Sequence, residues 1–216
     1  MNKMDFLQFL KYRGPEIFKL TGEHIKITGV AVLLAIIVGV PLGIYITKNK
    51  KITSSILNTA NIFQTLPSLA LFGLIIPIMG IGFIPAIFVL FLYALLPIIK
   101  NTYIGINNIE PSIIEAGRGM GMTKTQILTM VEIPLALPII MGGIRISTVI
   151  NIGTATIAAL IGAGGLGDFI FKGISMGNNN LILAGAVPTA LLAISIDFLL
   201  GLVEKKLTPQ GLKNNQ

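Results

Sequence analysis

Long stretches without charged residues limit what this sequence can fold into. The 216-residue chain has 16 Lys and Arg and 9 Asp and Glu residues, and these gather in short clusters. The longest charge-free runs cover residues 27–47, 52–99, 146–167 and 173–196. A helix of about 20 apolar residues crosses the hydrocarbon core of a bilayer. The chain is therefore predicted to be an integral membrane protein.

Five transmembrane helices follow from the lengths of these runs. The run at residues 52–99 is long enough for two spans and a turn, and a fifth apolar stretch begins near Pro138 and carries one internal charge, Arg145. Only 12% of the residues are charged, which is roughly half the share of ordinary soluble domains. We expect an all-α, polytopic membrane protein with spans near residues 27–47, 56–79, 82–100, 138–160 and 181–203.

Basic residues set the expected orientation, because Lys and Arg accumulate on the cytoplasmic side of membrane proteins. With residues 101–137 in the cytoplasm, nine basic residues lie inside and six outside. Five of those six lie in residues 1–26, which opposes this orientation, but the other charged loops agree with it. We expect residues 1–26 to form an extracytoplasmic or interfacial segment without a cleaved signal peptide, in which the Gly14–Pro15 pair breaks any helix. Residues 27–203 would form the transmembrane domain and residues 204–216 a cytoplasmic tail.

The residue types present exclude most catalytic sites. The chain has no Cys, which rules out disulfides, thiolate metal sites and cysteine nucleophiles. Its one histidine, His24, cannot form a zinc site or a His-based triad without partners, and its place near the first span favours an interfacial position. The net charge of +7 is explained by membrane topology, so no nucleic-acid partner is expected. We predict a subunit with no catalytic site, metal or cofactor of its own.

Residues 110–134 form a polar segment with a clear local pattern. Pro111 suits the first turn of a helix, and Thr123 with Gln126 fits the capping box that begins a second helix. Glycines at alternate positions interrupt the first helix: Gly117, Gly119 and Gly121. Two prolines are expected to end or kink the second helix: Pro134 and Pro138. The segment would dock a cytosolic partner, and the simpler alternative is an amphipathic loop resting on the membrane.

The same segment resembles the EAA motif of ABC importer permeases, which reads Glu-Ala-Ala, three residues, Gly, nine residues, Ile, one residue and Leu-Pro. The matching positions are Glu115, Ala116, Gly117, Gly121, Val131, Ile133 and Pro134. Three differ from the motif, with Gly117 in place of the second Ala, Val131 in place of Ile and Ile133 in place of Leu. The resemblance implies that this segment is the coupling helix, which sits in a groove of a separate cytosolic ATP-binding subunit.

The resemblance extends over essentially the whole chain. The permease subunit of glycine betaine, carnitine and choline importers is similar at IFQTLPSLALFGLIIP (residues 62–77), LYALLPIIKNTYIGI (residues 92–106) and IGAGGLGDFIF (residues 161–171). A permease of a methionine-type or other small-solute importer is the alternative. The resemblance implies an osmoprotectant importer of the bacterial cytoplasmic (inner) membrane. Its partners would be a second permease subunit, identical or paralogous, and an extracytoplasmic substrate-binding protein.

The sequence does not support a nucleotide-binding site in this chain. Three glycines match G-x-G-x-x-G: Gly162, Gly164 and Gly167. A dinucleotide site also needs a preceding strand and an acidic residue about 20 positions later, and no Asp or Glu lies between Asp168 and Asp197. We expect a tight extracellular turn there instead. The G-x-x-x-x-G-K-[ST] motif does not occur, so ATP would be bound by the partner subunit.

Polar residues inside the predicted spans are candidates for a substrate path or for helix pairing. Arg145 and Asp197 lie at matched depths, about 10 Å and about 9 Å from the cytoplasmic ends of their spans. This match predicts an ion pair, and the alternative is an Arg145 side chain that extends alone toward the surface. One face of the second span, with Asn151 of the fourth, would line the path or hold helices together. The residues of that face are Asn58, Asn61, Thr65 and Ser68.

A membrane scaffold or ion channel is the hypothesis from another functional class. A channel should show a ring of charged residues or a filter of backbone carbonyls, and the sequence indicates neither. An aromatic cage for a quaternary ammonium group is not evident either, because the chain has no Trp and only 7% aromatic residues. High-affinity recognition would then belong to the separate binding protein.

Overall fold

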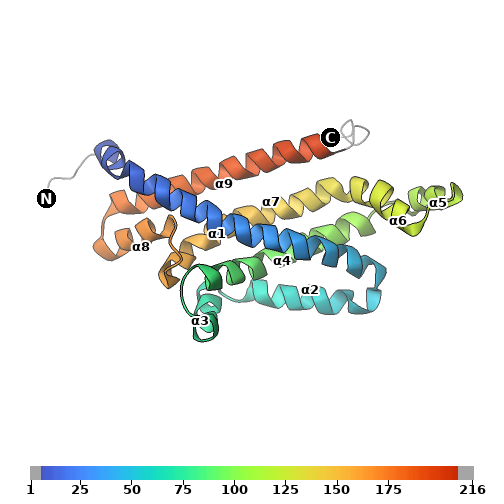
Figure 1. The fold of residues 1–216 in the computed structure, drawn as a ribbon, viewed down its shortest axis with the longest axis horizontal. Helices are drawn as coiled ribbons and strands as arrows, with labels where there is room; N and C mark the ends of the chain where they lie inside the picture. Colours follow the sequence, from blue (N-terminus) through green and yellow to red (C-terminus); the bar gives the residue numbers. More distant parts are fainter. Residues whose placement is uncertain (1–5, 209–216) are drawn as a thin grey trace.

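The computed structural model describes residues 6–208, and every regular element in this part of the chain is helical. Figure 1 shows an elongated bundle with α5 and α6 projecting at one end. The helices are α1 (Phe6–Lys48), α2 (Lys50–Thr65), α3 (Ser68–Met79), α4 (Phe83–Asn107), α5 (Pro111–Gly119), α6 (Lys124–Ile127), α7 (Ile133–Ala158), α8 (Gly167–Met176) and α9 (Asn179–Leu207). A π-turn, Leu128–Glu132, joins α6 to α7, and a 3-10 turn, Ala159–Ile161, follows α7. The predicted all-α fold class is confirmed.

Within residues 6–208, four helices are long and apolar enough to cross a membrane, and a bent pair raises the number to five. The four are α1, α4, α9 and the Lys124–Ile161 helix that contains α7. The third and fifth spans extend beyond their predicted ends, α4 to Asn107 and α9 to Leu207. The amphipathic helix α8 was not predicted. Its ten residues are too few to cross a bilayer, which is why a search for spans passes over it.

The first helix overturns the predicted break at Gly14–Pro15. α1 continues through both residues and begins well before residue 27. A proline inside a helix removes one hydrogen bond and crowds the preceding turn. Packing on both sides of the proline offsets this cost, because Phe9 and Leu20 are buried against residues of α8 and α9. The part of α1 that qualifies as a span is accordingly Lys11–Lys48.

The predicted second span, residues 56–79, is broken into two helices at Pro67. α2 ends at Thr65, α3 begins at Ser68, and the two helix axes differ by 99°. Pro67 has no N–H with which to continue the helix, and it favours the extended conformation that Leu66 adopts, with ψ of 136°. The Tyr93 hydroxyl of α4 donates a hydrogen bond to the Leu66 carbonyl oxygen at this break. The bend is therefore tied to the central helix.

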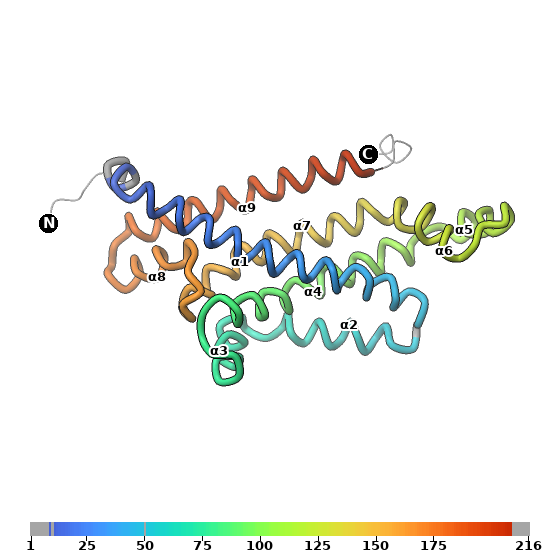
Figure 2. Tube along the Cα trace, in the orientation of Figure 1, coloured from blue at the N-terminus to red at the C-terminus, as the bar shows by residue number. Residues whose placement is uncertain are grey.

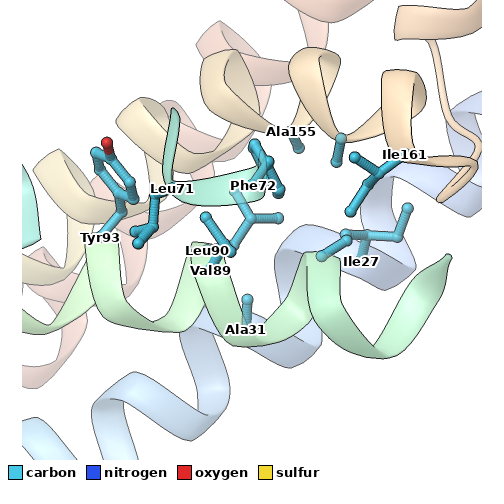
Figure 3. Packing of buried hydrophobic residues seen from close by; sticks show 11 residues of the cluster. Ile27, Ala31, Leu71, Phe72, Val89, Leu90, Tyr93, Ala155 and Ile161 are labelled. Carbon is cyan, nitrogen blue, oxygen red and sulfur yellow. The ribbon is translucent and has the colours of Figure 1, made fainter. Parts of the chain in front are cut away.

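α4 lies at the centre of the bundle, packed against α1 and α7. Figure 3 shows side chains of several helices meeting around Val89 and Leu90 of α4. Glycines let the backbones approach closely. A Cβ atom at Gly43 of α1 would lie 2.6 Å from Cβ of Thr102, and one at Gly143 of α7 would lie 2.8 Å from the Pro97 carbonyl oxygen. Small residues at such contacts are typical of associating transmembrane helices.

Candidate functional site

Residues 110–134, named the coupling segment after their predicted role, form a helical hairpin that projects from one end of the molecule (Figure 1). Pro111 occupies the first turn of α5, as predicted. The predicted capping box also begins α6. The Gln126 N–H donates to Thr123 Oγ1 at 3.3 Å, and the Thr123 N–H donates to Gln126 Oε1 at 2.8 Å. Both helices of the hairpin therefore start where their local sequence favours a helix N-terminus.

Two glycines of the motif are explained by the shape of this hairpin. Gly117 is buried where α5 meets α6, and an added Cβ would lie 3.4 Å from Met122 Sδ. Gly121 has a φ of 79°, a left-handed conformation that glycine adopts at no steric cost. Glu115 and Ala116 are exposed on α5. The hairpin thus closes through its glycines and leaves these two motif residues accessible to another subunit.

The helix does not end at Pro134 or Pro138, so the first of the two predicted outcomes, an end or a kink, is wrong. The π-turn precedes Pro134, and the Ile133 N–H bonds to the carbonyl of Leu128, five residues back instead of four. This wider turn accommodates a proline ring that would crowd the preceding turn of an α-helix. Pro138 lies inside α7. The coupling segment is consequently continuous with a span, because Lys124–Ile161 forms one helix.

Two charged residues that the sequence analysis missed join the coupling segment to α1. Glu132, at the end of the π-turn, is only 7% exposed and accepts a hydrogen bond from Nζ of Lys48, the last residue of α1, at 3.3 Å. Val131 beside it is half-buried. The pair borders a polar pocket of about 360 Å³, which Glu115 and Arg118 also line. The sequence signal was weak, because Glu132 occupies the variable position of the motif.

Arg145 and Asp197 come together and hold α7 to α9. The distance from Arg145 Nε to Asp197 Oδ1 is 2.9 Å, and that from Arg145 Nη2 to Asp197 Oδ2 is 3.0 Å. Arg145 Nη1 also donates to Glu204 Oε2 at 2.8 Å. Paired hydrogen bonds of this kind are among the stronger side-chain contacts. Glu204 was missed, although it follows Asp197 by two helical turns and so lies on the same face. We call these three residues the arginine clamp.

The polar residues expected to share one face are separated by the helix break. Asn58, Asn61 and Thr65 are exposed on α2, whereas Ser68 lies beyond the 99° bend on α3. The opposite side of α2 packs into a cluster with α1 and α4. Asn151 lies elsewhere, fully buried in α7, and neither polar atom of its amide has a hydrogen-bond partner among residues 6–208. The structure therefore groups three of these five residues.

His24 is buried inside the bundle rather than lying at an interface. Its Nε2 atom lies 2.9 Å from the Ile152 carbonyl oxygen of α7. The neighbouring Glu23 accepts a hydrogen bond from the Gly165 N–H at 3.2 Å. Gly165 belongs to the glycine turn, residues 162–167, where three glycines have positive φ. A helix precedes this turn, so the strand required for a dinucleotide fingerprint is absent there, and α1 packs against the turn instead.

Known proteins resemble this chain along nearly its whole length. Residues 39–209 match the family described as binding-protein-dependent transport system inner membrane component. The glycine betaine/carnitine/choline transport system permease protein OpuCB of Bacillus subtilis (strain 168) is 49% identical, over 99% of this chain and 97% of that protein. The osmoprotectant import permease protein OsmW of Salmonella typhimurium is 46% identical, over 97% of this chain and 100% of that protein.

The fold also matches a solved transporter. An inward-facing structure of the MetNI methionine ABC transporter aligns with a TM-score of 0.79 and 27% identity, over 95% of this chain and 100% of that one. Similarity of sequence and of fold therefore lead to the same class of membrane protein that the resemblance of residues 110–134 predicted.

Proposed function

Because the chain belongs to the family of binding-protein-dependent transport system inner membrane components, we propose that its cargo is an osmoprotectant such as glycine betaine, carnitine or choline. It is a permease subunit of an ABC importer. The transport functions of its relatives, for glycine betaine, carnitine and choline and for osmoprotectants, support the substrate class. The observation that carries the mechanism is the coupling segment, an exposed helical hairpin that continues directly into a span.

In this proposal the hairpin docks on a cytosolic ATP-binding subunit. Glu115 and Ala116 are the exposed contact residues, while Gly117 and Gly121 keep the hairpin closed. Val131 and Pro134 lie where the hairpin joins α7, so they transmit its movement to the span. ATP is bound by the partner, and this chain supplies neither a catalytic site nor a cofactor.

Two permease subunits, identical or paralogous, would enclose one path in the bacterial cytoplasmic membrane. An extracytoplasmic binding protein would deliver the substrate. Closure of the paired ATP-binding subunits would move both hairpins, and each hairpin would pull on its α7 helix. Rigid-body rocking of packed helices is the usual way in which such movement exposes a path to alternate sides.

The exposed polar side of α2 is the proposed wall of this path. Asn58, Asn61 and Thr65 point away from the packed side of the helix. Polar groups in a bilayer need water or another polar partner. A water-filled path meets this need, and so would hydrogen bonds to the second permease, which is the alternative role for these residues. Weak amide and hydroxyl contacts suit a path that must release its substrate.

The test is ATP-driven uptake into proteoliposomes that hold this permease with its ATP-binding subunit and binding protein. Labelled glycine betaine, carnitine, choline and methionine are compared. We expect uptake of a quaternary amine by the wild-type complex. Glu115→Lys and Gly121→Asp should abolish this uptake, although each variant permease is still inserted in the membrane. Glu16→Lys, the same charge reversal in α1, serves as the control. Gly119→Ala should be tolerated and Gly121→Ala should be impaired, because only Gly121 has a positive φ.

Each contrary result has a distinct meaning. Uptake of methionine alone would assign the chain to a methionine-type importer. Normal uptake in both Glu115→Lys and Gly121→Asp would show that the ATP-binding subunit docks elsewhere.

A further inference from the structure

Among residues 6–208, one ion pair connects the coupling segment to the end of α1. Lys48 Nζ and Glu132 Oε2 lie 3.3 Å apart, although all of the helices from α2 to α6 lie between the two residues in the sequence. Glu132 is buried, whereas Glu110 and Glu115 of the same segment are exposed. A carboxylate that is withdrawn from solvent needs a partner, and Lys48 is the one the structure provides.

The position of Glu132 within the π-turn makes this contact sensitive to movement of the hairpin. The Ile133 N–H bonds five residues back, to Leu128, so the turn holds one residue more than an α-helical turn. Tightening it to an α-turn would rotate the residues on its two sides by about 100° relative to each other. Such a rotation would carry the Glu132 carboxylate away from Lys48. The ion pair and the π-turn therefore favour the same arrangement.

Lys48, the other member of the pair, is the last residue of α1, which is one continuous helix from Phe6 to Lys48. Figure 2 shows its trace running along the bundle from the region of α8 to the start of α2. Near its other end, Glu23 bonds to Gly165 and His24 contacts the Ile152 carbonyl. A displacement of Lys48 can thus reach the glycine turn, because Lys48 and the residues that contact the turn belong to the same helix.

We propose that Lys48 and Glu132 are positioning residues that transmit movement of the coupling segment to α1. The inference rests on the proposed docking role of that segment. α7 receives the movement through the peptide backbone and α1 receives it through the ion pair. Helices on both flanks of α4 then shift together. The Lys48 side chain is half-exposed and lines the polar pocket, so the pair can separate and re-form as the pocket changes shape.

The decisive measurement is the number of substrate molecules imported per ATP hydrolysed by the full complex in proteoliposomes. Lys48→Gln and Glu132→Gln should each lower this ratio by about fivefold, while the ATPase rate stays within about twofold of wild type. The charge-exchanged double variant, Lys48→Glu with Glu132→Lys, should return the ratio to within about twofold. Lys51→Gln is the matched control, because Lys51 is exposed on α2 and forms no ion pair with the part of the chain that the structure describes.

Three results would overturn the inference: an unchanged ratio in both single variants, a double variant no better than the singles, or a parallel fall in ATPase rate and uptake. The last would indicate a general structural defect. A wild-type complex without ATP-driven uptake contradicts the proposed function instead.

A second readout does not depend on transport. The chain lacks Cys, so spin labels at Tyr45→Cys in α1 and Thr125→Cys in α6 would report the distance between the two sides of the pair. We expect one narrow distance distribution in the wild-type background and a broad one in Glu132→Gln. Identical distributions in the two backgrounds would show that the ion pair does not position the hairpin.

Discussion

α4 and α9 are both long apolar helices, yet their surroundings are opposite. In the most apolar stretch of each helix, 56% of the residues of α4 are buried inside the chain, compared with 6% for α9. α4 packs against α1, α2, α3 and α7, whereas α9 packs mainly against α7 and α8. Hydropathy detects both spans but does not separate a central helix from a peripheral one, because lipid tails are as apolar as a protein interior.

The two helices are also held in place differently. Close backbone contacts at Gly43 and Gly143 fit α4 between its neighbours. α9 is anchored near its ends, where a Cβ at Gly185 would lie 2.7 Å from the Leu166 carbonyl oxygen, and where the arginine clamp reaches it from α7. Between these points an apolar cavity of about 240 Å³ separates α9 from α1. Shape complementarity thus holds the central helix, and two local anchors hold the outer one.

The largest effect is expected from Gly43→Leu. The added side chain would meet Thr102 and the Ile99 carbonyl oxygen within 3 Å, so α1 and α4 would have to separate. Overpacking of this kind should lower the free energy of unfolding by about 3 kcal/mol. Gly29→Leu on the same helix is the control, because a Cβ there meets nothing within 4 Å. Thermal unfolding in detergent measures both, and equal midpoints would show that this contact does not hold α4.

A matched pair of leucines compares the two helices directly. Leu90 of α4 is fully buried and Leu199 of α9 is 53% exposed. Leu90→Ala should cost about 2 kcal/mol of unfolding free energy through lost packing, and Leu199→Ala should cost less than about 0.5 kcal/mol. The same thermal measurement applies. A large effect at Leu199 would mean that another subunit covers α9 and that its exposure in the single chain is misleading.

Removal of the arginine of the clamp should lower the free energy of unfolding less than Gly43→Leu does, and substitutions that reverse a charge of the clamp should abolish transport. Arg145→Gln leaves Asp197 and Glu204 without their cation, which we expect to cost about 1 to 2 kcal/mol. Uptake lost in Arg145→Asp and in Asp197→Arg should return when the two are combined. Absence of rescue at normal expression would show that the pair does not hold α7 to α9 during transport.

The smallest effect distinguishes the two carboxylates of the clamp. Asp197 accepts two hydrogen bonds from Arg145 and Glu204 accepts one. Asp197→Asn should therefore lower the free energy of unfolding more than Glu204→Gln, by about 0.5 kcal/mol. The thermal unfolding midpoints of the two variants measure this difference. The reverse order would assign the main anchor of α9 to Glu204.

Local signals predicted parts of the candidate site well. The capping box at Thr123 and Gln126 and the helix start at Pro111 depend on residues three or fewer positions apart, and the structure shows both. Contacts over longer separations were found less completely. Arg145 and Asp197 were predicted to pair because charges inside apolar runs are rare. Glu132 and Lys48 lie in polar segments with several other charged residues, so the sequence does not indicate which of these form a pair. Their pairing depends on how α1 and the π-turn meet.

The effect of each proline on its helix was also predicted only in part from the sequence. The sequence predicted a break at Pro15 and an end or a kink at Pro134, and helices continue through both because packing or a π-turn accommodates the ring. Pro67 and Pro77 were expected to interrupt the span at residues 56–79, and the helix breaks at Pro67 with a bend of 99°, whereas Pro77 lies inside α3. Proline always removes a hydrogen-bond donor. Whether the helix ends depends on what surrounds the ring.

The amino-acid sequence by itself determined the membrane setting, the approximate spans and the family, because charge-free length and motif spacing are properties of the chain alone. Tertiary structure decided which span is central, which polar residues are exposed on α2, and that Lys48 and Glu204 join the ionic contacts. These features depend on the relative position and rotation of packed helices. Close contacts between small residues set that geometry, and they form only when distant parts of the chain meet.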